Sequence, residues 1–62
     1  MKIKELRERN KTEFKLYMSF STFHDGDTLC RRIVLQKDGI PKYISEDYEI
    51  LHNGEWISPH IN

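Results

Sequence analysis

The pair Asn53-Gly54 between two short apolar segments constrains the fold of this chain more than any other feature. Asn-Gly is the strongest short-range signal for a two-residue β-hairpin, because a type I′ turn needs positive φ at both central residues. Glycine adopts such a φ without steric cost, and asparagine tolerates it. The C-terminal third is therefore predicted to be antiparallel sheet with a fixed register. The predicted facing pairs are His52–Glu55, Leu51–Trp56 and Ile50–Ile57.

The N-terminal segment predicts a helix. Residues 2–10 place Ile3 and Leu6 three positions apart on one apolar edge, with charged side chains on the remaining surface. We expect Asn10 to end this helix in the left-handed conformation, which asparagine tolerates. A helix this short must dock against other elements to be stable. The alternation of residues 1–4 leaves a short first strand as the alternative.

The middle of the chain predicts strands separated by turns. Residues 12–23 alternate apolar and polar side chains with a period of two, which indicates a long strand with one buried face. Residues 28–36 predict a second strand, with both faces partly covered. Residues 40–44 contain a proline, which cannot donate to a β-ladder, so this segment belongs at an edge or a strand start. Turn residues at 24–27 and 37–39 separate these segments.

Together these segments predict an α+β, mainly β fold in a single small domain, residues 1–62. A short N-terminal helix is followed by a four- to five-stranded antiparallel meander, with a small open barrel as the alternative arrangement. A domain of this size buries only about 60% of the surface that its unfolded chain exposes, so its stability is expected to be modest. Pairing of exposed strand edges in a homodimer would increase that stability. The predicted core consists of large apolar side chains: Phe14, Leu16, Met18, Phe20, Ile33, Leu35, Tyr48, Ile50 and Ile57.

Charge is balanced overall but segregated along the chain. The first 15 residues hold six Lys or Arg and three Glu, and the remainder holds four basic and seven acidic residues. Residues 45–55 contain four acids and no Lys or Arg. This asymmetry indicates either that one end packs on the other or that two charged surfaces meet partners. It excludes a uniformly basic nucleic-acid coat.

Catalytic and metal-binding signals are weak. The turn Asp25-Gly26-Asp27 offers too few oxygens for a calcium loop and is explained by turn chemistry. No glycine-rich phosphate loop or nucleophile signature is present, so we expect no enzyme activity and no cofactor. Soft or borderline metal ligands lack the close spacing of a zinc site, so no metal site is expected. These ligands are His24, Cys30, His52 and His60.

The single cysteine and the absence of an apolar leader favour a cytoplasmic protein. Cys30 cannot form an intramolecular disulfide, which suits a reducing compartment, and it is expected to fill a small space in the core. Nine of the first 15 residues are charged, where a signal peptide would carry an apolar region. No apolar run approaches the length of a membrane span, so no membrane partner is expected.

The function favoured by these observations is binding of another protein, as an adaptor or inhibitor of the kind that small bacterial or bacteriophage genes often encode. An unpaired edge near Pro41 would let a partner add a strand. Aromatic and apolar residues would supply contact energy, and acidic residues would complement a basic partner. The predicted contact residues are Trp56, Leu51, Tyr43, Glu46, Asp47 and Glu49.

The alternative function is binding of single-stranded nucleic acid. Basic side chains would contact phosphates while an aromatic ring stacks on bases. The zero net charge and the acidic run from residue 45 oppose this reading. The residues of this alternative site are Lys2, Lys4, Arg7, Arg9, Tyr17, Arg31 and Arg32.

Overall fold

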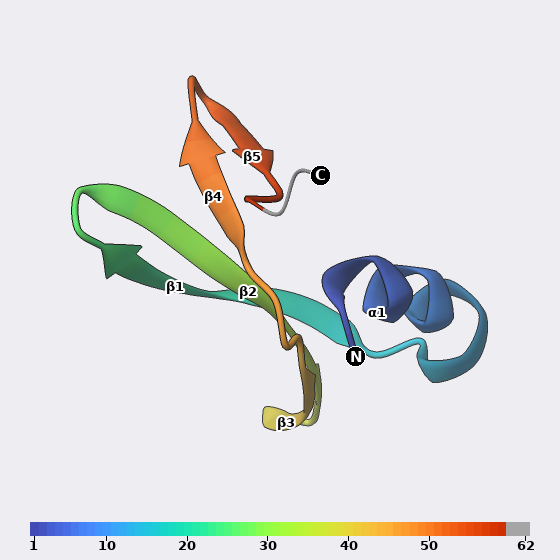
Figure 1. Cartoon of the computed structure of the whole chain (residues 1–62). Coiled ribbons are helices and arrows are strands. Elements are labelled where there is room, and N and C mark those ends of the chain that lie inside the picture. The colour runs from blue at the N-terminus through green and yellow to red at the C-terminus, as the bar shows by residue number, and fades with distance from the viewer. Residues whose placement is uncertain (60–62) are drawn as a thin grey trace.

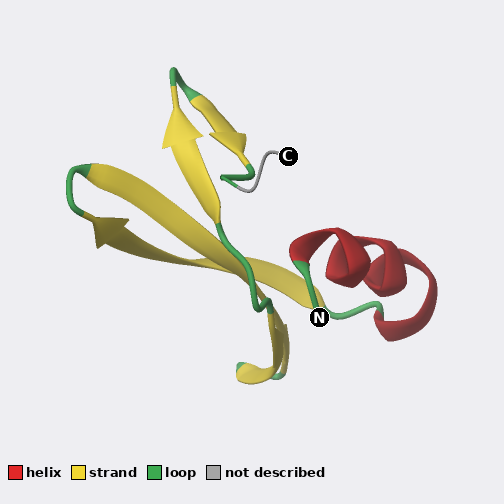
Figure 2. Ribbon diagram, in the orientation of Figure 1, coloured by secondary structure: helices red, strands yellow, loops and turns green. Residues whose placement is uncertain are grey.

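The computed structural model describes residues 1–59 as a short helical segment followed by one open antiparallel sheet (Figures 1 and 2). The predicted α+β, mainly β fold is confirmed, and the sheet does not close into a barrel. The elements are α1 (Ile3–Arg9), the π-helical turn η1 (Asn10–Phe14), β1 (Tyr17–Asp25), β2 (Thr28–Lys37), β3 (Ile40–Ile44), β4 (Glu49–His52) and β5 (Glu55–Ile57).

Strand β2 organises the sheet. Strand β1 pairs with it along its whole length on one side. On the other side β2 has two partners in succession, β3 at its C-terminal end and β4 at its N-terminal end. Strand β5 pairs with β4, and this hairpin rises away from β3 in Figure 1. The sheet order β1-β2-β4-β5 leaves the outer side of β1 unpaired among the described residues.

The turns confirm the hairpin predictions. Asn53 and Gly54 have φ of 51° and 79°, as a type I′ turn requires, and the three facing pairs of this hairpin are those expected. Asp38 and Gly39 repeat the same chemistry between β2 and β3, with φ of 52° and 78°. Local sequence therefore determines both turns and the register of β4 with β5, whereas the pairing of β2 with β3 shifts register between Leu35 and Gln36.

The N-terminal helical segment is longer than predicted. Asn10 has a right-handed conformation (φ −66°, ψ −30°), and the chain continues through the π-helical turn η1 to Lys15, which takes the left-handed conformation (φ 51°). The Asn10 side chain instead accepts a hydrogen bond from the Leu16 backbone N–H and donates one to the Leu16 carbonyl. The first strand accordingly begins at Tyr17 rather than at residue 12.

The buried core lies between α1 and one end of the sheet. Ile3 and Leu6 of α1 pack with Ile33 and Leu35 of β2, and Leu6 is fully buried. Partly buried hydrophobic side chains surround this cluster: Met1, Phe14, Leu16 and Tyr43. Of the predicted core, Ile33 and Leu35 are therefore confirmed. Ile3 and Leu6 were predicted only as the apolar edge of the helix.

Met18 and Phe20 were predicted to be core residues, and this is wrong. They are 38% and 43% exposed. Met18 lies beside Leu35 and Phe20 beside Ile33, and both of these β2 residues are fully buried. The helix α1 packs against β2 and not against β1, so the side chains of this edge strand stay uncovered. The remaining core candidates are only half-buried: Tyr48, Ile50 and Ile57.

Candidate functional site

Alternation along β2 defines the two faces of the sheet. Arg31, Ile33 and Leu35 share the face on which α1 packs, which we call the helix face. Strand pairing places Phe20 of β1 opposite Ile33 and Glu49 of β4 opposite Arg31, so these side chains lie on the helix face as well. Functional candidates on this face are the side chains that the helix leaves uncovered.

A partly apolar surface occupies the uncovered half of the helix face. We call it the open patch, and it comprises Met18 and Phe20 of β1, Arg31 of β2, Leu51 of β4 and Trp56 of β5. Leu51 is 38% exposed, and Trp56, which faces it across the hairpin, is half-buried. The patch thus gathers side chains from four strands that form two hairpins, one in the middle of the chain and one near its C-terminal end.

Arg31 is the centre of the open patch. Its guanidinium carbon lies 3.9 Å from the ring centroid of Phe20 and 4.3 Å from that of Trp56, so cation–π contacts join the two rings through it. Its Nε donates a 2.9 Å hydrogen bond to Oε1 of Glu49, and Nη1 of Arg7 lies 3.2 Å from Oε2 of the same carboxylate. Glu49 is 9% exposed. This arrangement holds the patch rigid and links it to α1.

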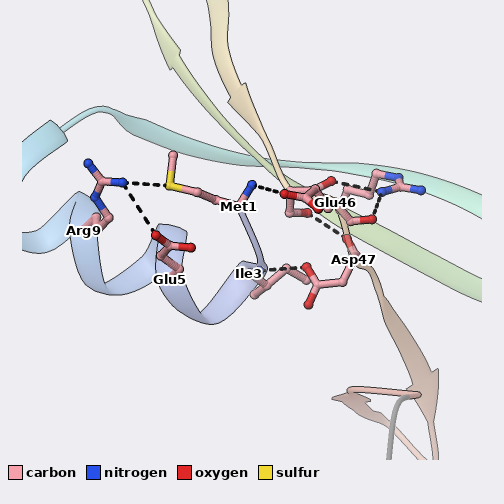
Figure 3. Close-up of polar contacts among 8 residues, drawn as sticks. Met1, Ile3, Glu5, Arg9, Glu46 and Asp47 are labelled. Carbon is pink, nitrogen blue, oxygen red and sulfur yellow. Dashed lines mark hydrogen bonds and ion pairs between the residues drawn. The ribbon is translucent and has the colours of Figure 1, made fainter.

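The acidic segment that precedes β4 binds the N-terminal segment (Figure 3). The Met1 ammonium group donates to Oε2 of Glu46, and the Ile3 backbone N–H donates a 2.7 Å hydrogen bond to Oδ1 of Asp47. The hydrogen bond and the positive charge of Met1 lower the pKa of Glu46 below its ordinary value. One end of the chain therefore packs on the other, which was one of the two interpretations of the charge segregation.

These contacts bear on the predicted partner-binding residues. Glu46, Asp47 and Glu49 all have partners inside the chain. Tyr43 stacks on Phe14 with ring centroids 4.4 Å apart and packs against the core cluster. Among the six predicted contact residues, the structure brings Leu51, Trp56 and Glu49 together and places the others elsewhere.

The arginines of the alternative nucleic-acid site also have intramolecular partners. Arg7 and Arg31 share Glu49, and Arg9 pairs with Glu13 and Glu5. Arg32 donates to the carbonyls of Ser45 and Glu46. The other members of this set, Lys2, Lys4 and Tyr17, are exposed. Tyr17 lies on the face opposite Arg31, because residues 17 and 36 face each other across β1 and β2.

A groove of about 450 Å³ separates α1 from the segment that enters β4. Lys4, Arg7, Glu8 and Lys11 line its helical wall, and Asp47 and Glu49 line the opposite wall. Asp47 and Glu49 already have partners within the chain. The two exposed lysines therefore outnumber the one exposed carboxylate of the groove, that of Glu8, which weakens the expectation of a basic partner.

Sequence reasoning missed two members of the open patch, Met18 and Phe20, because it assigned them to the core. A signal was available: one short helix, about 10–12 Å across, cannot cover a sheet of four or five strands about 4.8 Å apart, so some apolar positions on that face had to remain exposed. The central position of Arg31 depends on the pairing of β2 with β4. No local motif predicts that pairing, because β3 lies between β2 and β4 in the sequence.

Metal and membrane signals are weak in the part of the chain that the structure describes. Within residues 1–59, no group of three or more His, Cys, Asp or Glu side chains could hold a metal ion. Cys30 is fully buried and does not form a disulfide, and His60 lies outside the described residues. In the same range, no helix has both the length and the apolar character needed to cross a bilayer.

Comparisons of the chain with protein families, with curated proteins and with solved structures find no match.

Proposed function

We propose that this protein binds another protein through the open patch. The observation that carries the proposal is the exposure of Met18, Phe20 and Leu51 beside Trp56 on one face of the sheet, around an arginine that is held in place. Contiguous exposed apolar surface on a small protein indicates an interaction site. Tryptophan and arginine are the residues that most often dominate the energy of protein interfaces.

The patch is built for binding without rearrangement. The Glu49 carboxylate binds Arg31 on one side and Arg7 on the other, so the guanidinium group between the two rings is already oriented. Pre-organised side chains lose less conformational entropy when a partner docks. Because the charges at the centre of the patch are paired within the chain, the contribution of the patch comes from apolar and aromatic contact rather than from a salt bridge to the partner.

An adaptor or inhibitor role fits this surface, and nothing in the geometry favours nucleic acid over protein. A phosphate backbone would require arginines that now bind Glu49, Glu13 and Glu5 to exchange partners. Tyr17, the proposed stacking platform, lies on the opposite face from Arg31.

Leu51→Lys is expected to abolish partner binding, with Ile44→Lys as its matched control. Leu51 lies in the open patch, whereas Ile44 is 55% exposed and faces away from it, opposite Val34. A charge buried in an interface lowers the binding free energy by at least about 2 kcal/mol, which weakens the affinity about 30-fold. The measurement is capture of proteins from cell lysate after nuclease treatment, with tagged wild type and both variants side by side.

The proposal predicts a discrete protein that wild type and Ile44→Lys recover and Leu51→Lys loses, while both variants keep the circular dichroism spectrum of the wild type. Equal recovery by all three proteins would exclude the open patch as the contact surface. Recovery of nucleic acid that disappears after nuclease treatment would favour the alternative function instead.

A further inference from the structure

The outer side of β1 is an unprotected sheet edge. The strand has nine residues, and Tyr17–Phe23 contains no charged residue and no proline. Proteins usually protect such edges with charges, prolines, bulges or short strands, because unpaired backbone groups recruit another strand. The other edges have these features: β3 contains Pro41 and Lys42, and β5 has only three residues.

The register identifies which backbone groups of β1 face outward. In a two-residue hairpin the residues that flank the turn form a hydrogen-bonded pair, so Asp25 and Thr28 exchange backbone hydrogen bonds. Pairs alternate from there, so the odd-numbered residues of β1 bond to β2 and the even-numbered residues point their N–H and C=O groups outward. The outward-facing residues of the strand are Met18, Phe20, Thr22 and His24.

This open edge has a defined beginning and end. Leu16 would continue the outward series, but the Asn10 side chain already binds both its N–H and its carbonyl. At the other end the strand stops at Asp25, before the turn. The open series from Met18 to His24 is therefore centred on Ser21.

We infer that a second copy of this chain pairs with β1, antiparallel, about a two-fold axis at Ser21. In this register Met18 pairs with His24 of the other copy and Phe20 pairs with Thr22, so every open backbone group of β1 finds a partner. Any shift of register would leave some of these groups unpaired.

Charge supports pairing with a second copy. An exposed lysine, Lys15, precedes β1, and the exposed carboxylates of Asp25 and Asp27 lie at the opposite end. Antiparallel pairing brings the basic end of one copy next to the acidic end of the other, whereas parallel pairing would align like charges. The neutral strand between these ends has no charge that would select a partner of opposite sign.

Such pairing extends the open patch. A two-fold axis perpendicular to a continuous sheet leaves the helix faces of both copies on the same side. Phe20 of each copy would then lie beside Thr22 of the other and diagonal to its Phe20, and the two patches would form one surface with a helical segment at each side. This inference goes beyond the proposed function, since the second copy occupies the edge and leaves the face accessible.

Cysteine cross-linking tests the axis directly. In the inferred register the two Ser21 residues form a non-hydrogen-bonded pair with Cα atoms about 4.5 Å apart, within the range that a disulfide requires. The matched control is Ser19→Cys on the same face and strand. Its two copies would lie about 13 Å apart along the strand, too far for a disulfide. The native Cys30 is buried and common to both variants.

We expect Ser21→Cys to convert to a disulfide-linked dimer under mild oxidation, while Ser19→Cys remains monomeric on a non-reducing gel. Sedimentation of the wild type at the same concentration should give twice the mass of one chain. Failure of both variants to cross-link, equal cross-linking of both, or a monomeric wild-type mass would each overturn the inference. Because Leu51 is not on this edge, the partner-binding test remains separate from this one.

Discussion

Leu6→Ala is expected to lower the free energy of unfolding by about 2–5 kcal/mol. Leu6 is fully buried and packs with Ile3, Ile33 and Leu35 in the buried cluster. A domain of this size has a total stability of about 3–9 kcal/mol, so the variant would lose a large share of it. Because a seven-residue helix does not persist alone in water, we expect helix and sheet to unfold together.

Urea unfolding followed by the fluorescence of Trp56, with circular dichroism as the second probe, measures this loss. Leu51→Ala is the matched control, because the same substitution at a side chain that is 38% exposed leaves little cavity. Leu51→Ala should lower the free energy of unfolding by less than about 1 kcal/mol. Equal midpoints for the two variants would mean that α1 contributes nothing to the core.

Glu49→Gln is expected to have the second largest effect and to lower the free energy of unfolding by about 2–3 kcal/mol. This value lies between those for the loss of exposed and of buried ion pairs. One carboxylate serves both Arg7 and Arg31, with N–O distances of 3.2 and 2.9 Å. Removal of its charge leaves two guanidinium groups near each other, and Arg31 is only 16% exposed. Repulsion between the two guanidinium groups and the uncompensated desolvation of Arg31 then both destabilise the folded state.

Glu13→Gln is the control for this variant. Its carboxylate lies 2.7 Å from Nη2 of Arg9 but is 56% exposed, so loss of the pair should cost no more than about 0.5 kcal/mol. Thermal unfolding of both variants and the wild type compares the two pairs. If Glu49→Gln were as stable as Glu13→Gln, the Arg31 side chain would not need this carboxylate for its position.

Short-range chemistry accounts for what the sequence could predict. The residues Asn53-Gly54 predicted a hairpin together with its register, and residues 37–39 predicted the turn between the second and third strands. The presence of strands followed from alternation and from β-branched and aromatic residues. These signals depend only on neighbours in the chain, so the fold class was accessible without knowledge of the tertiary packing.

Long-range contacts account for what the sequence could not predict. Asn10 was expected to end the helix through its own backbone, but its side chain binds Leu16 and the helix continues. The apolar alternation of Met18 and Phe20 is that of a buried face, and they stay exposed because α1 packs against β2 and not against the edge strand β1. The contact of Arg31 with Trp56 depends on two strand pairings at once, β2 with β4 and β4 with β5.

Residue-resolved hydrogen exchange along β1 tests the central claim most directly, that its outer edge is a pairing surface beside the open patch. The inward amides of Ser19, Ser21 and Phe23 should be protected at every protein concentration. The outward amides of Met18, Phe20, Thr22 and His24 should become protected as concentration rises, because the second copy binds them. Outward amides that exchange rapidly at all concentrations, while the inward ones remain protected, would show a monomer with an open edge and contradict the account.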